Sequence, residues 1–147
     1  MAVIFFVQFK KLYLILLKLA VMKEQTISRL AIILLAIVMA VFGIYHFVYP
    51  QNLLAYVPSF FPPAGNLWVY IPGAAFILAA AAFITNKMVK TAAYLLAVLL
   101  LIFVLTVHLP NFLNGSSDEY RQLSLINLLK DTAIAAFALH IASNSSN

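Results

Sequence analysis

Long apolar runs, separated by short polar or proline-rich segments, dominate the chain. No Asp, Glu, Lys or Arg occurs between Leu30 and Asn86. That interval is far longer than the roughly 20 residues that one helix needs to cross hydrocarbon, so it must hold two spans and a turn. A membrane β-barrel would instead show alternating segments of about ten residues. The pattern therefore predicts an all-α membrane bundle.

The apolar runs delimit four transmembrane helices. We expect them at about residues 28–49, 67–85, 91–110 and 120–142. Each has the length that a tilted spanning helix requires. Trp68 and Tyr70 lie at the start of the second span, Pro110 at the end of the third, and the fourth is the only one with charges inside it.

The distribution of basic residues predicts the orientation of this four-helix bundle. One side carries seven of the nine basic residues: Lys10, Lys11, Lys18, Lys23, Arg29, Lys87 and Lys90. The opposite side carries Arg121, and Lys130 lies inside the fourth span. Because cytoplasmic loops are enriched in Lys and Arg, both termini are expected in the cytoplasm, and four spans agree with that.

The connections between spans have distinct compositions. Residues 50–66 contain four prolines but no charge, and the aromatic side chains of Tyr56, Phe60 and Phe61 suit an interface or a cap over the bundle. An irregular segment exposed to lipid is not tolerated, so this loop must lie at the surface or on protein. In the third connection, Ser116 and Glu119 have the spacing of a capping box that would open the fourth helix.

The first 21 residues form a segment that differs from the rest. Lys11 and Lys18 are seven residues apart, so a helix here would carry a basic stripe on an apolar body, as interfacial helices do. The segment lacks the charged start and the cleavage site of a signal peptide. A start-site overrun before Met22 is the alternative interpretation. The predicted domains are thus residues 1–21, an amphipathic extension, and residues 22–147, the membrane domain.

Composition excludes several function classes. Hydrophobic residues make up 65% of the 147 residues and charged residues 9%. A soluble domain of this size could not bury so many hydrophobic residues. The absence of cysteine excludes thiol chemistry and thiolate-bound metal clusters. The net charge is +5. The basic residues are placed as the cytoplasmic charges of a membrane protein rather than along a groove, so we expect no nucleic-acid partner.

One polar stripe on the fourth span carries the candidate chemistry. Tyr120, Ser124, Asn127 and Asp131 share a helical face by their spacing, and Lys130 lies at its edge. Charges inside a span cost about 2.5–3.5 kcal/mol each on the insertion scale. They could form a site in the outer half of the bundle for an anionic or quinone-like group. They could also form a structural ion pair, which the pattern favours.

Two histidines are expected in the same half of the membrane. His46 lies one turn before the end of the first span and His108 shortly before Pro110. The predicted ligand-binding residues are His46, His108, Asn127, Lys130 and Asp131. No catalytic residue, metal ligand or cofactor motif is evident; contact with a quinone is one hypothesis, and a bis-histidine haem site is disfavoured.

Small residues predict where helices approach closely. Ala36, Ala40 and Gly43 form a stripe on the first span, and Gly73, Ala75 and Ala79 do so on the second. Small side chains let helix backbones touch in membranes, so we assign these six residues to packing.

The polar, glycine and proline residues that interrupt the apolar runs resemble those of DoxX-type membrane proteins. The resemblance rests on three segments: residues 43–47 (Gly-Ile-Tyr-His-Phe) with the prolines that follow, residues 68–73 (Trp-Val-Tyr-Ile-Pro-Gly), and residues 127–131 (Asn-Leu-Leu-Lys-Asp). It covers about residues 27–142 and implies a four-helix membrane bundle, in some members a subunit of a quinone-linked oxidoreductase or a detoxification complex. Phe76 stands where many members carry an acidic residue, which weakens any role that needs that carboxylate.

Three functions follow as hypotheses. The first is an accessory or anchoring subunit, without catalysis of its own, that docks a protein partner at the inner (plasma) membrane of a bacterium. The second is a small-molecule binder or transporter that uses the outer polar cluster. The third is a chaperone-like scaffold. The lipid bilayer and either a protein partner or a second copy of the chain are the expected partners.

Overall fold

The computed structural model describes the backbone of residues 2–146 and the side chains of residues 10–146. All its regular elements in this range are helical: α1 (Ala2–Val48), α2 (Pro50–Leu54), α3 (Leu67–Thr85), α4 (Val89–Phe103), the π-helical turn η1 (Val104–His108), α5 (Leu109–Asn114) and α6 (Asp118–Asn144). Four stretches of the described chain are long and apolar enough to cross a membrane: Lys10–Val48, Leu67–Thr85, Val89–Asn114 and Asp118–Asn144. The predicted all-α class and the four candidate spans are confirmed.

The chain divides into two compact units, one up to Leu34 and one from Leu35 onward. In the first unit, the side chains from Lys10 to Ser28 are exposed. The predicted extension, of which Lys11 and Lys18 are part, is helical and belongs to α1. Whether it lies on a membrane surface stays a prediction.

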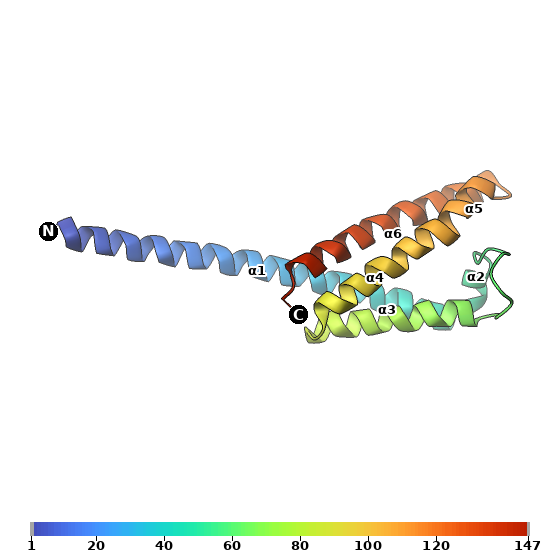
Figure 1. The fold of residues 1–147 in the computed structure, drawn as a ribbon, viewed down its shortest axis with the longest axis horizontal. Coiled ribbons are helices and arrows are strands. Elements are labelled where there is room, and N and C mark those ends of the chain that lie inside the picture. Colours follow the sequence, from blue (N-terminus) through green and yellow to red (C-terminus); the bar gives the residue numbers. More distant parts are fainter. Residues whose placement is uncertain (1, 147) are drawn as a thin grey trace. The chain divides into compact units, whose positions relative to one another are not determined.

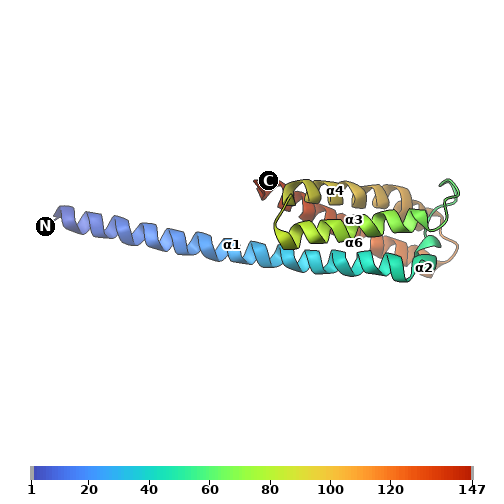
Figure 2. The same cartoon turned by 90° about the horizontal axis from the view of Figure 1, so that it is seen from below.

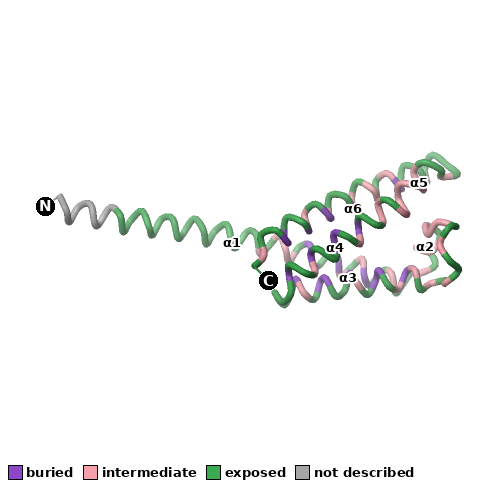
Figure 3. The backbone as a smooth tube through the Cα atoms, viewed as in Figure 1, coloured by how far each residue is buried: buried purple, intermediate pink, exposed green. Residues whose placement is uncertain are grey.

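Buried and exposed residues alternate along the helices of the second unit (Figure 3), and many large apolar side chains face outward. Its core contains eight fully or almost fully buried alanines: Ala36, Ala79, Ala80, Ala93, Ala97, Ala135, Ala138 and Ala142. Leu78 and Leu95, by contrast, are 70% and 65% exposed. Without lipid such outward leucines would be unfavourable, whereas alanine-lined contacts allow the close helix packing that membranes favour.

The Leu35–Val48 part of α1 approaches α3 closely at two glycines. A Cβ atom built on Gly43 would lie 2.9 Å from the Gly73 carbonyl oxygen and 2.6 Å from Ile77 Cγ1. A Cβ atom on Gly73 would lie 2.7 Å from His46 Cβ. The predicted packing stripe is thus in contact at its two glycines, and the contact fixes the position of the His46 backbone against α3. Of the other predicted members, Ala36 and Ala79 are buried, while Ala40 and Ala75 are partly exposed.

The third span differs from the prediction at its end. Pro110 was expected to close it, but the chain stays helical through η1 and α5 to Asn114. Proline lacks an N–H group and clashes with the carbonyl four residues earlier, here that of Thr106. A π-helical turn over Val104–His108 widens the helix at that point, which is a common way to accommodate such a disruption.

The N-cap predicted for the fourth span is wrong by one residue. Ser117, rather than Ser116, is the N-cap of α6, and its Oγ accepts a hydrogen bond from the Tyr120 N–H at 3.2 Å. Glu119 therefore falls at the second helical position, where it cannot complete the predicted capping box. Asp118 and Glu119 still lie in the first turn, where negative charge favours the helix dipole.

Helix α4 packs against both α3 and α6. Figure 1 shows α3 and α6 diverging toward the end of the bundle that carries α2 and α5, while Figure 2 shows α4 beside α3 from below. The connection between α1 and α3, predicted to be irregular, begins with the short helix α2, whose first residue is Pro50. It lies at the end where the helices diverge, which positions it over the functional site.

The glycine contact yields a stability prediction. Gly43→Ala should lower the free energy of unfolding by up to about 2 kcal/mol. The added methyl group overpacks against a backbone oxygen at a cost of about 1–3 kcal/mol, and the helix propensity gained offsets about 1 kcal/mol of that cost. Ala74→Val on the exposed face of α3 is the matched control and should have little effect. Thermal unfolding in detergent measures both; a Gly43→Ala protein as stable as the wild type would contradict the close approach.

Candidate functional site

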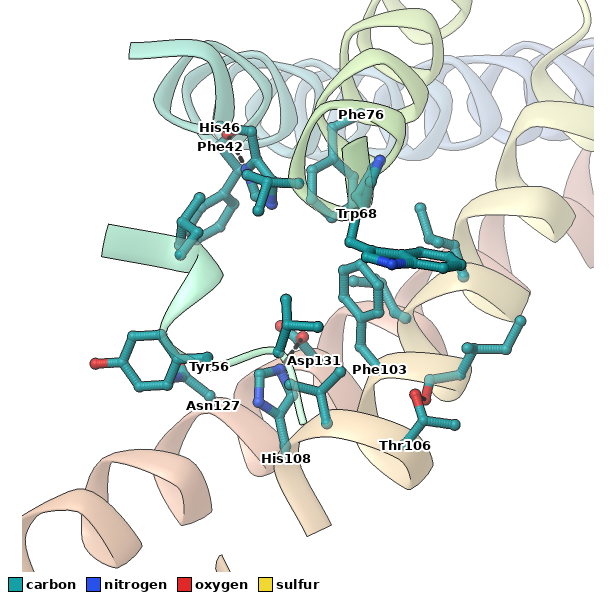
Figure 4. A pocket seen from close by; sticks show the side chains of 18 of the residues that line it. Phe42, His46, Tyr56, Trp68, Phe76, Phe103, Thr106, His108, Asn127 and Asp131 are labelled. Carbon is teal, nitrogen blue, oxygen red and sulfur yellow. Dashed lines mark hydrogen bonds and ion pairs between the residues drawn. The ribbon is translucent and has the colours of Figure 1, made fainter. Parts of the chain in front are cut away.

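A cavity of about 470 Å³ lies in the second unit, at the end where α3 and α6 diverge. Its wall combines aromatic and aliphatic side chains with a few polar ones (Figure 4). The polar and ionisable side chains of the wall are Tyr45, His46, Tyr56, Trp68, Thr106, His108, Asn127, Lys130 and Asp131. All five residues that the sequence proposed as ligand-binding residues line this one cavity.

The most buried polar contact in the wall joins η1 to α6. His108 Nε2 lies 2.9 Å from Asp131 Oδ2, and the two side chains are 13% and 7% exposed. Asp131 comes from the inward face of α6, together with the buried Ser124. A carboxylate in such surroundings needs a partner, because an unpaired buried charge is strongly unfavourable. The contact therefore ties the π-helical turn to α6.

Lys130 completes the polar cluster from the edge of the same helix face. Its ammonium group donates to Asn127 Oδ1 at 3.1 Å, lies 3.5 Å from Asp131 Oδ1, and sits 4.6 Å above the centre of the Phe42 ring. The ammonium group therefore has one hydrogen bond, one ion pair and one aromatic contact within the site. The sequence placed Lys130 at the edge of the stripe, and in the structure its ammonium group contacts the stripe residues Asn127 and Asp131.

His46 is held on the α1 side of the cavity. Its Nδ1 lies 2.7 Å from the Phe42 carbonyl oxygen. Because a carbonyl can only accept, Nδ1 carries the proton, and Nε2 of the neutral ring is then an acceptor. No described side chain forms a hydrogen bond with this Nε2, which leaves an acceptor available to a ligand.

Aromatic rings separate the two histidines. The Phe76 ring packs edge-on against His46 with centroids 5.3 Å apart, and against Phe103 at 6.3 Å. Phe103 in turn packs edge-on against His108 at 6.5 Å. Figure 4 shows His46 and Phe76 on one wall and His108 and Asp131 across from them. The space between them therefore has apolar, aromatic sides and polar groups from α1 on one side and η1 and α6 on the other.

The connection between α1 and α3 covers the end of the cavity. The Tyr56 carbonyl accepts a hydrogen bond of 2.8 Å from Asn111 Nδ2 of α5, and the Tyr56 ring stacks on Tyr120 with centroids 5.4 Å apart. Trp68 Nε1 donates to the Pro62 carbonyl at 2.8 Å. Of the three aromatics predicted to cap the bundle, Tyr56 and Phe61 line the cavity, whereas Phe60 is 65% exposed.

Sequence reasoning missed several residues of the site. Phe42, Phe103 and Thr106 gave no signal, because each is one apolar or weakly polar residue within a long apolar run. Asn111 was not among the predicted site residues, although a single amide just past a proline in a membrane helix is a signal for a contact between elements.

The polar groups of the wall can offer hydrogen bonds and charges to a bound molecule. The described residues contain no group of three or more His, Asp or Glu side chains that could hold a metal ion. The Thr106 hydroxyl donates to the Ile102 carbonyl at 2.7 Å. The bis-histidine haem site, which the sequence disfavours, stays a hypothesis.

The cover over the cavity can be tested with a matched pair of substitutions in α5. Asn111→Ala should remove the bond to Tyr56 and speed amide hydrogen exchange of residues 55–61 by about fivefold to tenfold, which corresponds to a hydrogen bond of about 1 kcal/mol. Asn114→Ala is the control, since that amide bonds only to Pro110 of its own helix. Equal exchange in the two variants would mean that Asn111 does not hold the cover.

Comparison with known proteins adds a family to this geometry. No curated protein matches the chain, and no solved structure does either. Residues 35–142 match the family described as Domain of unknown function (DUF8561). The matched range includes every residue of the cavity wall and covers most of the 147-residue chain. The chain therefore belongs to that family.

Proposed function

We propose that this protein binds a small, mostly apolar molecule with a polar head inside its membrane bundle. The observation that carries the proposal is the convergence of His46, His108, Asn127, Lys130 and Asp131 on one aromatic-lined cavity. Ligand sites are usually concave and mainly apolar, with a few polar groups that fix orientation. The volume of about 470 Å³ is within the range of about 300–1,000 Å³ that is typical of such sites.

This proposal reverses the order of the sequence-based hypotheses. The accessory-subunit hypothesis rests on the DoxX resemblance, which remains a proposal, as does contact with a quinone pool. The cavity supports the small-molecule hypothesis directly, because a purely structural ion pair would need no space beside it. A binder could still work beside a partner enzyme, and the chaperone-like scaffold is the least supported of the three.

The proposed location is the outer half of a bacterial inner membrane. The cavity lies at the end of the bundle away from Lys87, which is in the connection between α3 and α4, and from Lys90, which is in the first turn of α4. If basic loops face the cytoplasm, both termini are cytoplasmic and the cavity belongs to the outer leaflet. This topology places the α5–α6 turn, with Ser116, outside the cell.

The binding proposal is tested by extracting tagged protein gently and measuring its native mass. Wild-type protein should carry a small-molecule adduct that is reduced in His46→Ala, because that change removes an acceptor without breaking the His108–Asp131 contact. Tyr94→Phe, an exposed position on α4 that does not line the cavity, is the control. Wild-type protein free of any adduct, and accompanied by enzyme subunits in a fixed ratio, would instead support the accessory-subunit hypothesis.

The absence of cysteine makes the topology easy to test. Single cysteines at Ser116 and Ser146 should react oppositely with a membrane-impermeant maleimide added to intact cells. Ser116→Cys should be labelled from outside, and Ser146→Cys only after the cells are opened. The reverse pattern would place the cavity in the cytoplasmic half.

A further inference from the structure

The cavity is covered at the end of the bundle but not along its side. Its end lies under the connection held by the Tyr56–Asn111 hydrogen bond and the Tyr56–Tyr120 stack. In contrast, cavity-lining side chains are exposed on two sides: Tyr45 of α1 and Leu123 of α6 are 41% and 42% exposed, and Ile71 of α3 and Ile102 of α4 are 53% and 48% exposed. Of these two pairs of helices, α1 and α6 are the ones that also carry the polar lining residues His46, Asn127 and Lys130. Lys130, which reaches the Phe42 ring from α6, has a side chain that is 36% exposed. We call the four residues Phe42, Tyr45, Leu123 and Lys130 the side opening.

The side opening faces lipid if α1 and α6 span the bilayer. A guest that reaches the cavity through it must first dissolve in the membrane, because water does not occupy the hydrocarbon region. The apolar rings of Phe42, Phe76 and Phe103 then offer the guest an environment similar to lipid. The site is consequently suited to a lipid-soluble molecule rather than to a solute from water.

The charges of the wall indicate a neutral head group. The Lys130 ammonium and the Asp131 carboxylate lie 3.5 Å apart and compensate each other. Asn127 Oδ1 and the Phe42 ring also contact the ammonium group. An anionic or cationic guest would therefore bring an uncompensated charge into a low-dielectric site, which is unfavourable.

The hydrogen-bonding groups narrow the head group further. His46 Nε2 is an acceptor, since Nδ1 is committed to the Phe42 carbonyl. Asn127 uses its Oδ1 for Lys130, and its Nδ2 group, a donor, has no described hydrogen-bond partner. One wall thus offers an acceptor and the other a donor. A hydroxyl group is the smallest neutral head that both donates and accepts.

We propose that the cavity takes a neutral lipid with a free hydroxyl head, which enters from the bilayer between α1 and α6. The hydroxyl donates to His46 Nε2 and accepts from Asn127, while the apolar body lies among the aromatic rings and leaves through the side opening. This inference rests on the proposed binding function. It is narrower, because it excludes the anionic ligands that the sequence alone left open.

The head-group assignment is tested with the full chain in lipid nanodiscs and three photoreactive probes. The probes share one sixteen-carbon diazirine chain (about the length of a natural acyl chain) and carry an alcohol, a sulfate or a trimethylammonium head. The alcohol should label peptides of the cavity wall at least about tenfold more than either charged probe. His46→Ala should lower alcohol labelling about fivefold to tenfold, the effect of one lost hydrogen bond of about 1–1.4 kcal/mol.

The side opening is tested with a matched pair of substitutions on α6. Leu123→Trp should slow alcohol labelling, since the larger ring narrows the opening. Ile126→Trp, at a position 61% exposed and outside the cavity wall, should not. Circular dichroism and thermal unfolding establish that each variant is folded, so that a loss of labelling reports on the site.

The outcomes separate the inference from the function on which it rests. Charged probes that label the wall as well as the alcohol would overturn the neutral head group and leave binding intact. Alcohol labelling unchanged in both His46→Ala and Leu123→Trp would overturn the assigned hydrogen bond and the side opening. Labelling of the cavity wall by none of the three probes would overturn both the inference and the proposed binding function.

Discussion

A carboxylate placed within a membrane span has to find its partners inside the protein, and Asp131 finds two. His108 contacts one carboxylate oxygen and Lys130 the other. Because hydrocarbon offers no hydrogen bonds, this requirement turns the polar stripe of α6 inward. The remaining large apolar residues of the helix can then face lipid. The polarity of the cavity is thus a consequence of how the bundle satisfies one charge.

Two backbone features bring the partners within reach. The Gly43–Gly73 approach places α1 directly against α3, which positions His46 beside Phe76. The π-helical turn, which precedes Pro110 and ends at His108, changes the direction in which the His108 side chain points relative to a regular α-helix. Both are local departures from ordinary helix packing, and both adjoin the cavity. Such departures are frequently found at functional sites.

The sequence predicted the spans well because bilayer thickness constrains helix length directly. Residues 67–85 were predicted as a span and form α3 over the same range. The five candidate site residues also share one cavity, since helical spacing and span order place them in the same half of the bundle. That part of the site follows from periodicity and topology alone.

The details that failed depend on contacts that periodicity does not contain. Pro110 was expected to end a helix, but a π-helical turn accommodates it. Ser116 and Ser117 are both suitable caps, and the choice between them depends on where α5 ends. The cavity itself could not be predicted, because its volume results from the divergence of α3 and α6 and from the cover that Asn111 holds.

A double-mutant cycle between His108 and Asp131 tests the account most directly. His108→Ala, Asp131→Ala and the double variant would be unfolded reversibly in mixed micelles, so that the free energy of coupling is obtained. A coupling of about 0.5–2 kcal/mol is predicted, as expected for residues in contact and for hydrogen bonds in membranes. Changes in unfolding free energy that simply add would mean that the two side chains do not interact. The contact between η1 and α6 would then not be what turns the polar stripe toward the cavity.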